Sequence, residues 1–271
     1  MNASLKLMAI FAHPDDESLG VGGTIARYVA EGVEVHLVTA TRGERGWFGD
    51  EASNPGLEAL GRIREKELLA AAKVLGISSV SFLDYIDGDL DQAPPQEAIG
   101  RIVSHVRRVR PDVVLTFGSD GAYGHPDHIA ISQFTSAALL RACDGSFTDA
   151  EGLEPHAVSK LYHMCNTTEE FRLYESIFGD LVMHIDGVAR RSSPVPDWYI
   201  TTKIDTSAYW TVVRSAVACH RSQLPGYESL LNLPDQTLST LWSHENYYRA
   251  FSTVNGGRRL ETDLFEGIRE A

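Results

Sequence analysis

The stretch IFAHPDDE, residues 10–17, joins an apolar run to a helical pattern, and the rest of the chain is organised around it. Residues 5–12 are largely apolar, which predicts a buried parallel strand. His13, Asp15 and Asp16 then lie on the turn at the carboxyl end of this strand, the edge where open α/β sheets bind ligands. An imidazole and two carboxylates in four residues can hold a divalent metal and leave one carboxylate as a base. The three-residue spacing of His13 and Asp16 points them to one side, and Asp15 to another.

A second turn, GAYGHPDH at residues 121–128, repeats the pattern. It follows an apolar strand expected over residues 113–117 and precedes a helix expected over residues 129–140. The acidic residues of the first turn could simply cap the following helix. A capping role needs no histidine, yet both turns contain one. We therefore expect the two turns to face each other across a crevice.

Strands and helices alternate as far as residue 140, which predicts a Rossmann-like α/β fold. Its mostly parallel sheet should carry helices on both faces and a metal site at the carboxyl ends of the strands. Further strands are expected over residues 33–39, 79–83 and 161–165, and helices over residues 18–31, 57–75, 96–110 and 205–220. We expect one domain over residues 1–271, with a core over about 1–165 and a less regular C-terminal elaboration over about 166–271.

Composition narrows the functional classes. The 271 residues are 43% hydrophobic, enough for a substantial core, and no apolar run approaches the ~20 residues of a membrane span. A net charge of −13 argues against binding to nucleic acid or to an anionic membrane. Three cysteines without CxxC spacing favour reduced side chains, so we expect a cytoplasmic protein. Homo-oligomerisation stays open.

The motifs together resemble those of a known family. HPDDE in the first turn and GxYGHPDH in the second are accompanied by REKEL at 64–68, FLD at 82–84 and CHRSQ at 219–223. This combination resembles the PIG-L/LmbE-like zinc-dependent N-acetylglucosaminyl deacetylases, which include deacetylases of the mycothiol and bacillithiol pathways. The resemblance runs to about residue 225 and does not specify the substrate.

The resemblance implies that His13, Asp16 and His128 bind one metal ion. Spacing alone does not choose between His125 and His128 as the second histidine. Two imidazoles and one carboxylate leave a coordination position open, as catalytic zinc sites do. Zinc is the expected cofactor, although the same N/O donors also accept iron(II).

The resemblance also implies the catalytic groups. It assigns Tyr123 and a protonated His125 as donors to the tetrahedral oxyanion. Asp15 is expected to act as the general base, because it lies beside Asp16 but points elsewhere. Asp127 is expected to orient His125 and to raise its pKa. Either Asp15 or His125 could protonate the leaving amine.

Substrate contacts are expected from neighbouring strand ends. The resemblance places them at Arg64 and Asp84, and Arg42 and Glu44 extend the set because they follow the strand expected over residues 33–39. Carboxylates and arginines suit the vicinal hydroxyls of a sugar. Alternatively, Arg64 could pair with Asp84 to tie its helix to the sheet.

Three further residues have weaker roles. His220 lies near the site in the family, but a packed core histidine fits the sequence as well. Trp47 and Phe48 lie in a long polar segment and could stack on the aglycone of the substrate.

The expected function is removal of an N-acetyl or other acyl group from an amino sugar or its glycoside, a small-molecule substrate. An amidase acting on a thiol conjugate or a non-sugar amide is the first alternative, and a metal-dependent phosphoesterase is the second. A dinucleotide-binding dehydrogenase is disfavoured, because HPDDE stands where a glycine-rich turn should be and no acidic residue ends the strand expected over residues 33–39.

Overall fold

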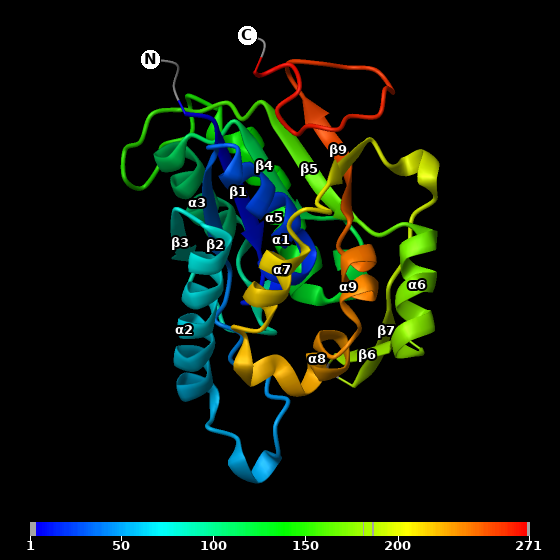
Figure 1. The fold of residues 1–271 in the computed structure, drawn as a ribbon. Coiled ribbons are helices and arrows are strands. Elements are labelled where there is room, and N and C mark those ends of the chain that lie inside the picture. The colour runs from blue at the N-terminus through cyan, green and yellow to red at the C-terminus, as the bar shows by residue number, and fades with distance from the viewer. Residues whose placement is uncertain (1–3, 181, 186, 270–271) are drawn as a thin grey trace.

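The computed structural model describes residues 4–180, 182–185 and 187–269. These residues form a seven-stranded sheet in the order β3-β2-β1-β4-β5-β9-β8 (Figure 1). All pairings from β3 to β5 are parallel, whereas β9 runs antiparallel to both β5 and β8. The strands are β1 (Lys6–Phe11), β2 (Glu34–Thr39), β3 (Ser79–Phe82), β4 (Val113–Phe117), β5 (Lys160–Cys165), β8 (Thr202–Asp205) and β9 (His244–Ser252).

Helices cover both faces of this sheet, as predicted. On one face α3 packs against α5, and on the other α1 packs against α2 and α7 (Figure 1). The core helices are α1 (Asp16–Ala30), α2 (Leu57–Leu75), α3 (Pro95–Val109), α4 (Gly121–Gly124), α5 (Pro126–Ala142) and α7 (Trp210–Val217). Because both faces are covered, the central strand β1 is fully buried from Leu7 to Phe11.

Several segments after β5 add short helices and a two-stranded hairpin to this fold. They include α6 (Thr168–Phe178), the hairpin β6 (Val182–Ile185) and β7 (Val188–Arg191), α8 (Leu224–Leu231) and α9 (Asp235–Leu241). Short 3-10 turns occur at Glu51–Ser53, Leu90–Gln92, Asp197–Tyr199 and Arg221–Gln223. A second hydrophobic cluster forms here from buried side chains of α7, α8 and α9, separate from the core around the sheet. None of the described helices combines the length and the apolar character needed to cross a membrane.

The helix α1 is kinked, and a residue from β9 compensates for the kink. Val21 leaves the helical region with φ −143°, which frees backbone N–H groups in the next turn. Gly23 and Thr24 donate these N–H groups to the Glu245 carboxylate at 2.8 and 3.0 Å. A Cβ at position 23 would lie 2.6 Å from Thr206, so glycine permits the close approach. The C-terminal strand therefore holds the helix that follows the first functional turn.

Most predicted elements are confirmed, and one is wrong in extent. The strand over residues 113–117 and the helix over residues 57–75 have the predicted limits. The helix predicted over residues 205–220 begins only at Trp210, because Thr202–Asp205 forms strand β8. Burial there alternates, with Thr202 and Ile204 buried and the next residues exposed, which is the period of a strand.

Candidate metal and active site

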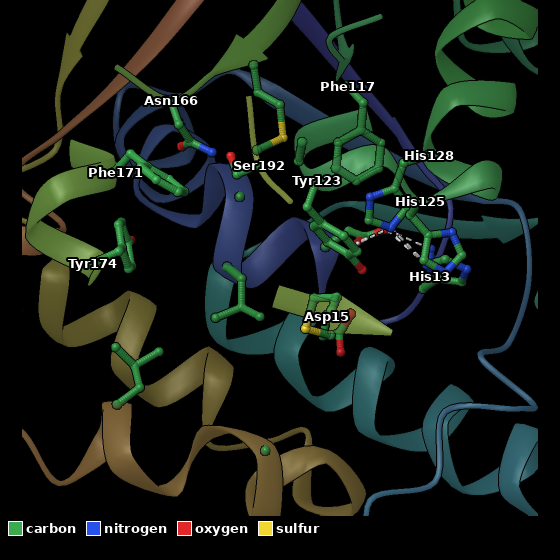
Figure 2. Close-up of a pocket in the computed structure, with 18 of the residues that line it drawn as sticks. His13, Asp15, Phe117, Tyr123, His125, His128, Asn166, Phe171, Tyr174 and Ser192 are labelled. Carbon is green, nitrogen blue, oxygen red and sulfur yellow. Dashed lines mark hydrogen bonds and ion pairs between the residues drawn. The ribbon is translucent and has the colours of Figure 1, made fainter. Parts of the chain in front are cut away.

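The two His-Pro-Asp turns face each other at the carboxyl ends of β1 and β4, which confirms the expected crevice. They lie at one end of a cavity of about 580 Å³ (Figure 2). Asp15, Tyr123 and the imidazoles of His13, His125 and His128 line it. A parallel sheet brings these turns together because all its strands end at the same edge.

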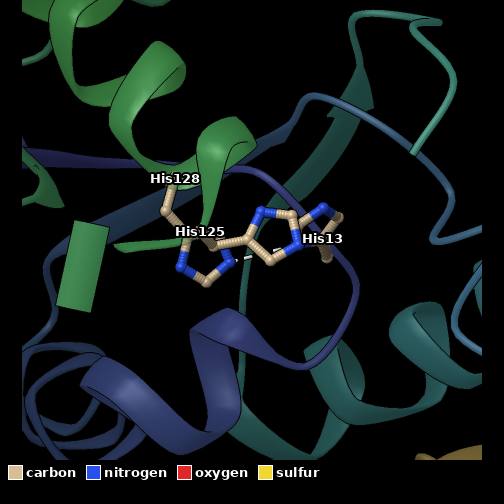
Figure 3. A group of neighbouring side chains, drawn as sticks. All are labelled: His13, His125 and His128. Atoms are coloured by element: carbon tan, nitrogen blue, oxygen red, sulfur yellow. Dashed lines mark hydrogen bonds between the residues drawn. The ribbon is translucent and has the colours of Figure 1, made fainter. Parts of the chain in front are cut away.

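Three of the predicted ligands present their donor atoms to one another. Nδ1 of His13 lies 3.1 Å from Nε2 of His128 (Figure 3). The Asp16 carboxylate lies 3.8 Å from the first nitrogen, through Oδ2, and 3.5 Å from the second, through Oδ1. Backbone N–H groups of Ala12 and His13 donate to Oδ2 of Asp16 at 3.1 and 2.7 Å, which fixes this carboxylate in place.

The second ring nitrogen of His13 and that of His128 each contact another group of the protein. Nε2 of His13 lies 3.0 Å from Asp87 and 3.1 Å from Asp127. Nδ1 of His128 lies 3.2 Å from the carbonyl oxygen of Gly121. Metal-binding histidines commonly donate their second N–H to a carboxylate or a carbonyl in this way.

Among the described residues, two groups of side chains are close enough to share an ion, and neither includes Asp16. Potential ligand atoms lie within 4.8 Å of one another in the set His13, His125 and His128 and in the set His13, Asp87 and Asp127. In the first set, Nδ1 of His125 already accepts the backbone N–H of Asp127 at 3.1 Å. In the second, Asp127 also accepts the backbone N–H groups of Gly88 and Leu90, at 2.7 and 3.2 Å.

Asp15 points away from Asp16, as predicted, and has a different partner. Its backbone is left-handed, with φ 111°, which is uncommon for a residue with a side chain. Arg64 donates to the Asp15 carboxylate at 3.1 Å and to the carbonyl oxygen of Pro14 at 2.6 Å. At the start of α1, Asp15 makes no side-chain capping hydrogen bond, so the capping interpretation is wrong for this residue.

The buried charges shift one another's pKa values. Burial alone would lower the pKa of His13, but the carboxylates of Asp87, Asp127 and Asp16 outweigh it and raise that pKa. Burial would raise the pKa of Asp87, yet the charge of His13 and its hydrogen bond hold it below the usual range. Burial raises the pKa of Asp16 to about 7.

The roles predicted for Asp127 and His125 need a correction. The carboxylate of Asp127 lies beside His13 rather than His125, but its charge raises the pKa of His125 as predicted, and its backbone N–H donates to Nδ1 of His125. The effect of this charge is outweighed. Burial and the neighbouring charge of His13 lower the pKa of His125 to about 4, so His125 is neutral near pH 7. Burial raises the pKa of Tyr123, so its hydroxyl keeps its proton.

Known proteins resemble this chain along its length. The family model for GlcNAc-PI de-N-acetylase, PIG-L, matches residues 8–139. A 1D-myo-inositol 2-acetamido-2-deoxy-alpha-D-glucopyranoside deacetylase from Rhodococcus jostii is 37% identical, over 97% of this chain and 98% of its own length. The chain belongs to the PIG-L family.

Other members and neighbours agree with this membership. A mycothiol S-conjugate amidase from Streptomyces coelicolor is 29% identical, over 100% of this chain and 99% of its own length. N,N'-diacetylchitobiose deacetylase from Pyrococcus horikoshii shares the fold with a TM-score of 0.65, at 22% identity over 90% of this chain and 83% of that one. The predicted family, the α/β fold and deacetylation as the reaction class are confirmed.

Among the substrate contacts expected from the PIG-L resemblance, only Arg64 lines the cavity within the described residues. A Cβ at Gly43 would clash with its guanidinium, so this loop fits closely around it. The alternative pairing of Arg64 with Asp84 is wrong, because Asp84 instead accepts a hydrogen bond from Arg42 at 2.6 Å. Arg42 and Asp84 thus lie outside the cavity lining, and Arg42 also donates to Glu65 at 2.6 Å.

The side chains of Glu44 and His220 are buried, and each contacts other residues of the protein. The Glu44 carboxylate accepts the backbone N–H groups of Arg42 and Asp87, at 3.2 and 3.1 Å. His220 lies 2.9 Å from Glu17, and both side chains are fully inaccessible to solvent. Neither residue is among the described residues that line the cavity of this PIG-L protein.

Sequence reasoning missed two residues close to the site. Asp87 contacts His13, and its only sequence signal was its position in the turn after the strand expected over residues 79–83. Glu17 accepts the backbone N–H of Asp15 at 3.0 Å, although it stands in the HPDDE motif itself. Of the two aromatic residues expected to stack on the aglycone, Phe48 lines the cavity.

Proposed function

We propose that this protein is a zinc-dependent N-deacetylase that removes the acetyl group from a 2-acetamido-2-deoxyglucopyranoside. One observation carries the proposal, namely the convergence of His13 Nδ1, His128 Nε2 and the Asp16 carboxylate at the end of a cavity. Two imidazoles and one carboxylate form the donor set of a catalytic zinc site with an open position.

The spacing and orientation of these donors fit a metal ion. His13 Nδ1 and His128 Nε2 are 3.1 Å apart, close to the roughly 3.4 Å expected between ligands of a tetrahedral site with ~2.1 Å bonds. Asp16 lies beside both nitrogens, with Oδ2 at 3.8 Å from the first and Oδ1 at 3.5 Å from the second. The second nitrogens of His13 and His128 are held by Asp87, Asp127 and Gly121, so the first nitrogens face the ion. When bound, the metal would polarise the amide carbonyl and lower the pKa of water.

Asp15 is the proposed general base. It lines the cavity beside the ligands, and the hydrogen bond from Arg64 holds one of its carboxylate oxygens. Asp15 takes a proton from the attacking water and returns it to the nitrogen that leaves. The amide C–N bond breaks, acetate forms, and the free amine carries the proton.

Tyr123 and His125 supply hydrogen bonds to the oxygen that gains charge. Since the backbone N–H of Asp127 occupies Nδ1 of His125, the neutral imidazole carries its proton on Nε2 and donates from there. The protonated hydroxyl of Tyr123 is a second donor. This assignment replaces the charged His125 expected from the sequence and leaves Asp15 as the proton carrier.

The relatives indicate which sugar to test first. The Rhodococcus jostii relative carries the name of a deacetylase for a glucosaminide of myo-inositol, and it matches this chain over nearly its full length. We therefore propose a 2-acetamido-2-deoxy-α-D-glucopyranoside as the substrate class. Of the sugar contacts expected from the sequence, Arg64 lines the cavity within the described residues.

The test measures metal content and release of free amine on the same purified sample. We expect about one zinc per chain, activity lost on chelation and restored by zinc, and both zinc and activity lost in His128→Ala. The matched control is His105→Ala on α3, outside the described cavity lining, which should keep both. Full activity in the chelated protein, or full metal content in His128→Ala, would refute the proposal.

Hydrolysis of an amide with a larger acyl group is the second candidate. The observation that favours it is the size of the cavity, about 580 Å³, which leaves space beyond the ligands. The relative named as a mycothiol S-conjugate amidase matches the whole chain. Faster cleavage of a longer acyl group than of acetyl on the same sugar would select this candidate.

A further inference from the structure

The cavity extends from the metal ligands into a region with an apolar wall. Figure 2 shows Phe171 and Tyr174 at the opposite side of the view from the three histidines, with Tyr123 and Asp15 between them. We call this part the apolar compartment, and its apolar wall is formed by Leu19, Phe171, Tyr174, Met183, Leu230 and Trp242.

Some of these side chains are only partly covered by the protein. Met183 on β6 is 39% exposed, and Phe171 and Tyr174 on α6 are half-buried. Leu230 and Trp242 belong to the second hydrophobic cluster and form the base of the compartment. Apolar surface facing water is unfavourable, so a ligand that covers it gains free energy.

Two polar side chains that line the cavity on this side, Asn246 and Glu245, are already hydrogen-bonded to the protein. Asn246 donates to Glu170 at 2.7 Å, and Glu170 also closes a capping box with Thr167. Glu245 accepts two backbone N–H groups of α1 and the hydroxyl of Tyr247. A ligand hydroxyl beside Asn246 or Glu245 would lose its hydrogen bonds to water and find these two groups already engaged.

The hairpin β6–β7 links this wall to the candidate catalytic groups. Met183 lies on β6, and Arg190 on β7 donates to the carbonyl oxygen of Gly124 at 2.9 Å. Gly124 immediately precedes His125, so the same hairpin contacts the second functional turn and lines the compartment. A substituent on a sugar that binds beside the proposed metal ligands would therefore lie in the same cavity.

We propose that the apolar compartment binds an apolar aglycone, an aryl or alkyl group on the anomeric oxygen of the substrate. The inference rests on the proposed deacetylation, because an acetyl group has only two carbons and leaves the compartment unfilled. A hydroxyl-rich aglycone would place polar groups against this apolar wall, which is unfavourable. The compartment thus selects glucosaminides by their apolar aglycone.

The first test compares two substrates that differ only in the aglycone. We expect kcat/KM for benzyl 2-acetamido-2-deoxy-α-D-glucopyranoside to exceed that of the methyl glycoside by about 10- to 100-fold, mainly through KM. Equal values for the two glycosides would overturn the inference while leaving the deacetylase proposal intact. If neither glycoside releases an amine, the proposed function itself fails.

Variants then locate the effect. Phe171→Ser and Met183→Ser should each reduce the benzyl-to-methyl ratio by several-fold, because they remove apolar contacts from the compartment. Leu140→Ser is the matched control, since Leu140 is 69% exposed on α5 and is not among the described lining residues. It should keep the wild-type ratio. An unchanged ratio in both compartment variants would refute the assignment.

Two further measurements separate aglycone binding from its alternatives. Calorimetry on Asp15→Asn should show the benzyl glycoside binding more tightly than the methyl glycoside, a readout that does not depend on turnover. Methyl glycosides with N-hexanoyl and N-acetyl groups should show no preference for the longer acyl chain. A strong preference for N-hexanoyl would assign the compartment to the acyl group and overturn the aglycone proposal.

Discussion

Asp15 and Asp16 are neighbours in the chain, yet their carboxylates have different partners. Asp16 faces His128, whereas Asp15 accepts a hydrogen bond from Arg64. The left-handed backbone of Asp15, with φ 111°, separates the two directions. Aspartate and asparagine tolerate this backbone region better than most residues, so the turn suits the residue that the proposed reaction needs there.

Asp15→Asn should keep the metal and the fold but lower kcat by about 10²–10⁴-fold, because an amide cannot accept the proton of water. Metal analysis and steady-state kinetics on one sample measure both effects. Asp84→Asn is a matched control, since Asp84 also has a positive φ, 58°, but lies outside the described cavity lining. Near wild-type turnover in Asp15→Asn would remove this residue from the mechanism.

The buried pair Glu17–His220 supports the turn that carries Asp15. Burial would raise the pKa of Glu17, but the charge of His220 outweighs it and lowers that pKa. The carboxylate also accepts the backbone N–H of Asp15. His220→Ala should leave a buried carboxylate without its cation, which typically costs about 3–5 kcal/mol of unfolding free energy.

Urea unfolding measures that loss, and kinetics test its effect on the turn. We expect kcat of His220→Ala to fall more than KM rises, because the turn carries Asp15 rather than a predicted sugar contact. His156→Ala removes a half-buried histidine that is hydrogen-bonded to the carbonyl oxygen of Pro111, and it is the comparison for stability alone. A fully stable His220→Ala would show that the pair contributes nothing to the turn.

Among the elements, α1 depends on a partner distant in sequence. Its kink at Val21 leaves N–H groups of Gly23 and Thr24 to be satisfied by Glu245 on β9. Glu245→Ala should therefore lower the unfolding free energy by about 1–3 kcal/mol, the usual cost of leaving buried backbone donors unpaired.

Denaturant unfolding of Glu245→Ala checks this expectation, with Glu58→Ala as the control. The Glu58 side chain is 86% exposed on α2, and surface substitutions usually stay within about 0.5 kcal/mol. Similar stability of the two variants would mean that the kinked segment finds other hydrogen-bond partners.

At the scale of the whole molecule, a buried charge network connects the C-terminal segment to the sheet. Glu261 contacts Lys160 at 2.8 Å and Arg249 at 2.7 Å, and it accepts hydrogen bonds from Tyr162 and Thr202. Burial would raise the pKa of Glu261, but these donors and cations lower it to about 2. The network joins three strands, β5, β8 and β9, to residues beyond the sheet.

The depressed pKa predicts how stability depends on pH. Because the folded pKa of about 2 lies below the ordinary value of 4.5, the contribution of Glu261 is complete above about pH 4.5 and is lost as pH falls toward 2. Glu261→Gln should be less stable at neutral pH by on the order of 2 kcal/mol. The difference from wild type, measured by urea unfolding, should shrink between pH 4.5 and 2. A stability difference between Glu261→Gln and the wild type that does not change with pH would contradict this expectation.

Local patterns in the sequence were sufficient for the α/β core and for the two functional turns. Strand Val113–Phe117 and helix Leu57–Leu75 follow from hydrophobic periodicity and from glycine and proline at their ends, which act over a few residues. Because parallel strands end at one edge, the same patterns also predicted that the turns meet. The segments after about residue 165 are short and half-exposed, so their periodicity is weak, and strand β8 was missed.

Side-chain partners were decided only by the tertiary structure. Arg64 pairs with Asp15 rather than Asp84, and Asp127 faces His13 rather than His125. Such choices depend on how elements pack and on which buried charge is nearest, and neither is encoded in local spacing. The apolar compartment likewise arises where α6, β6 and α8 close over the ends of the sheet strands. The sequence determined the reactive groups, whereas packing between distant segments decided their partners and the shape of the space around them.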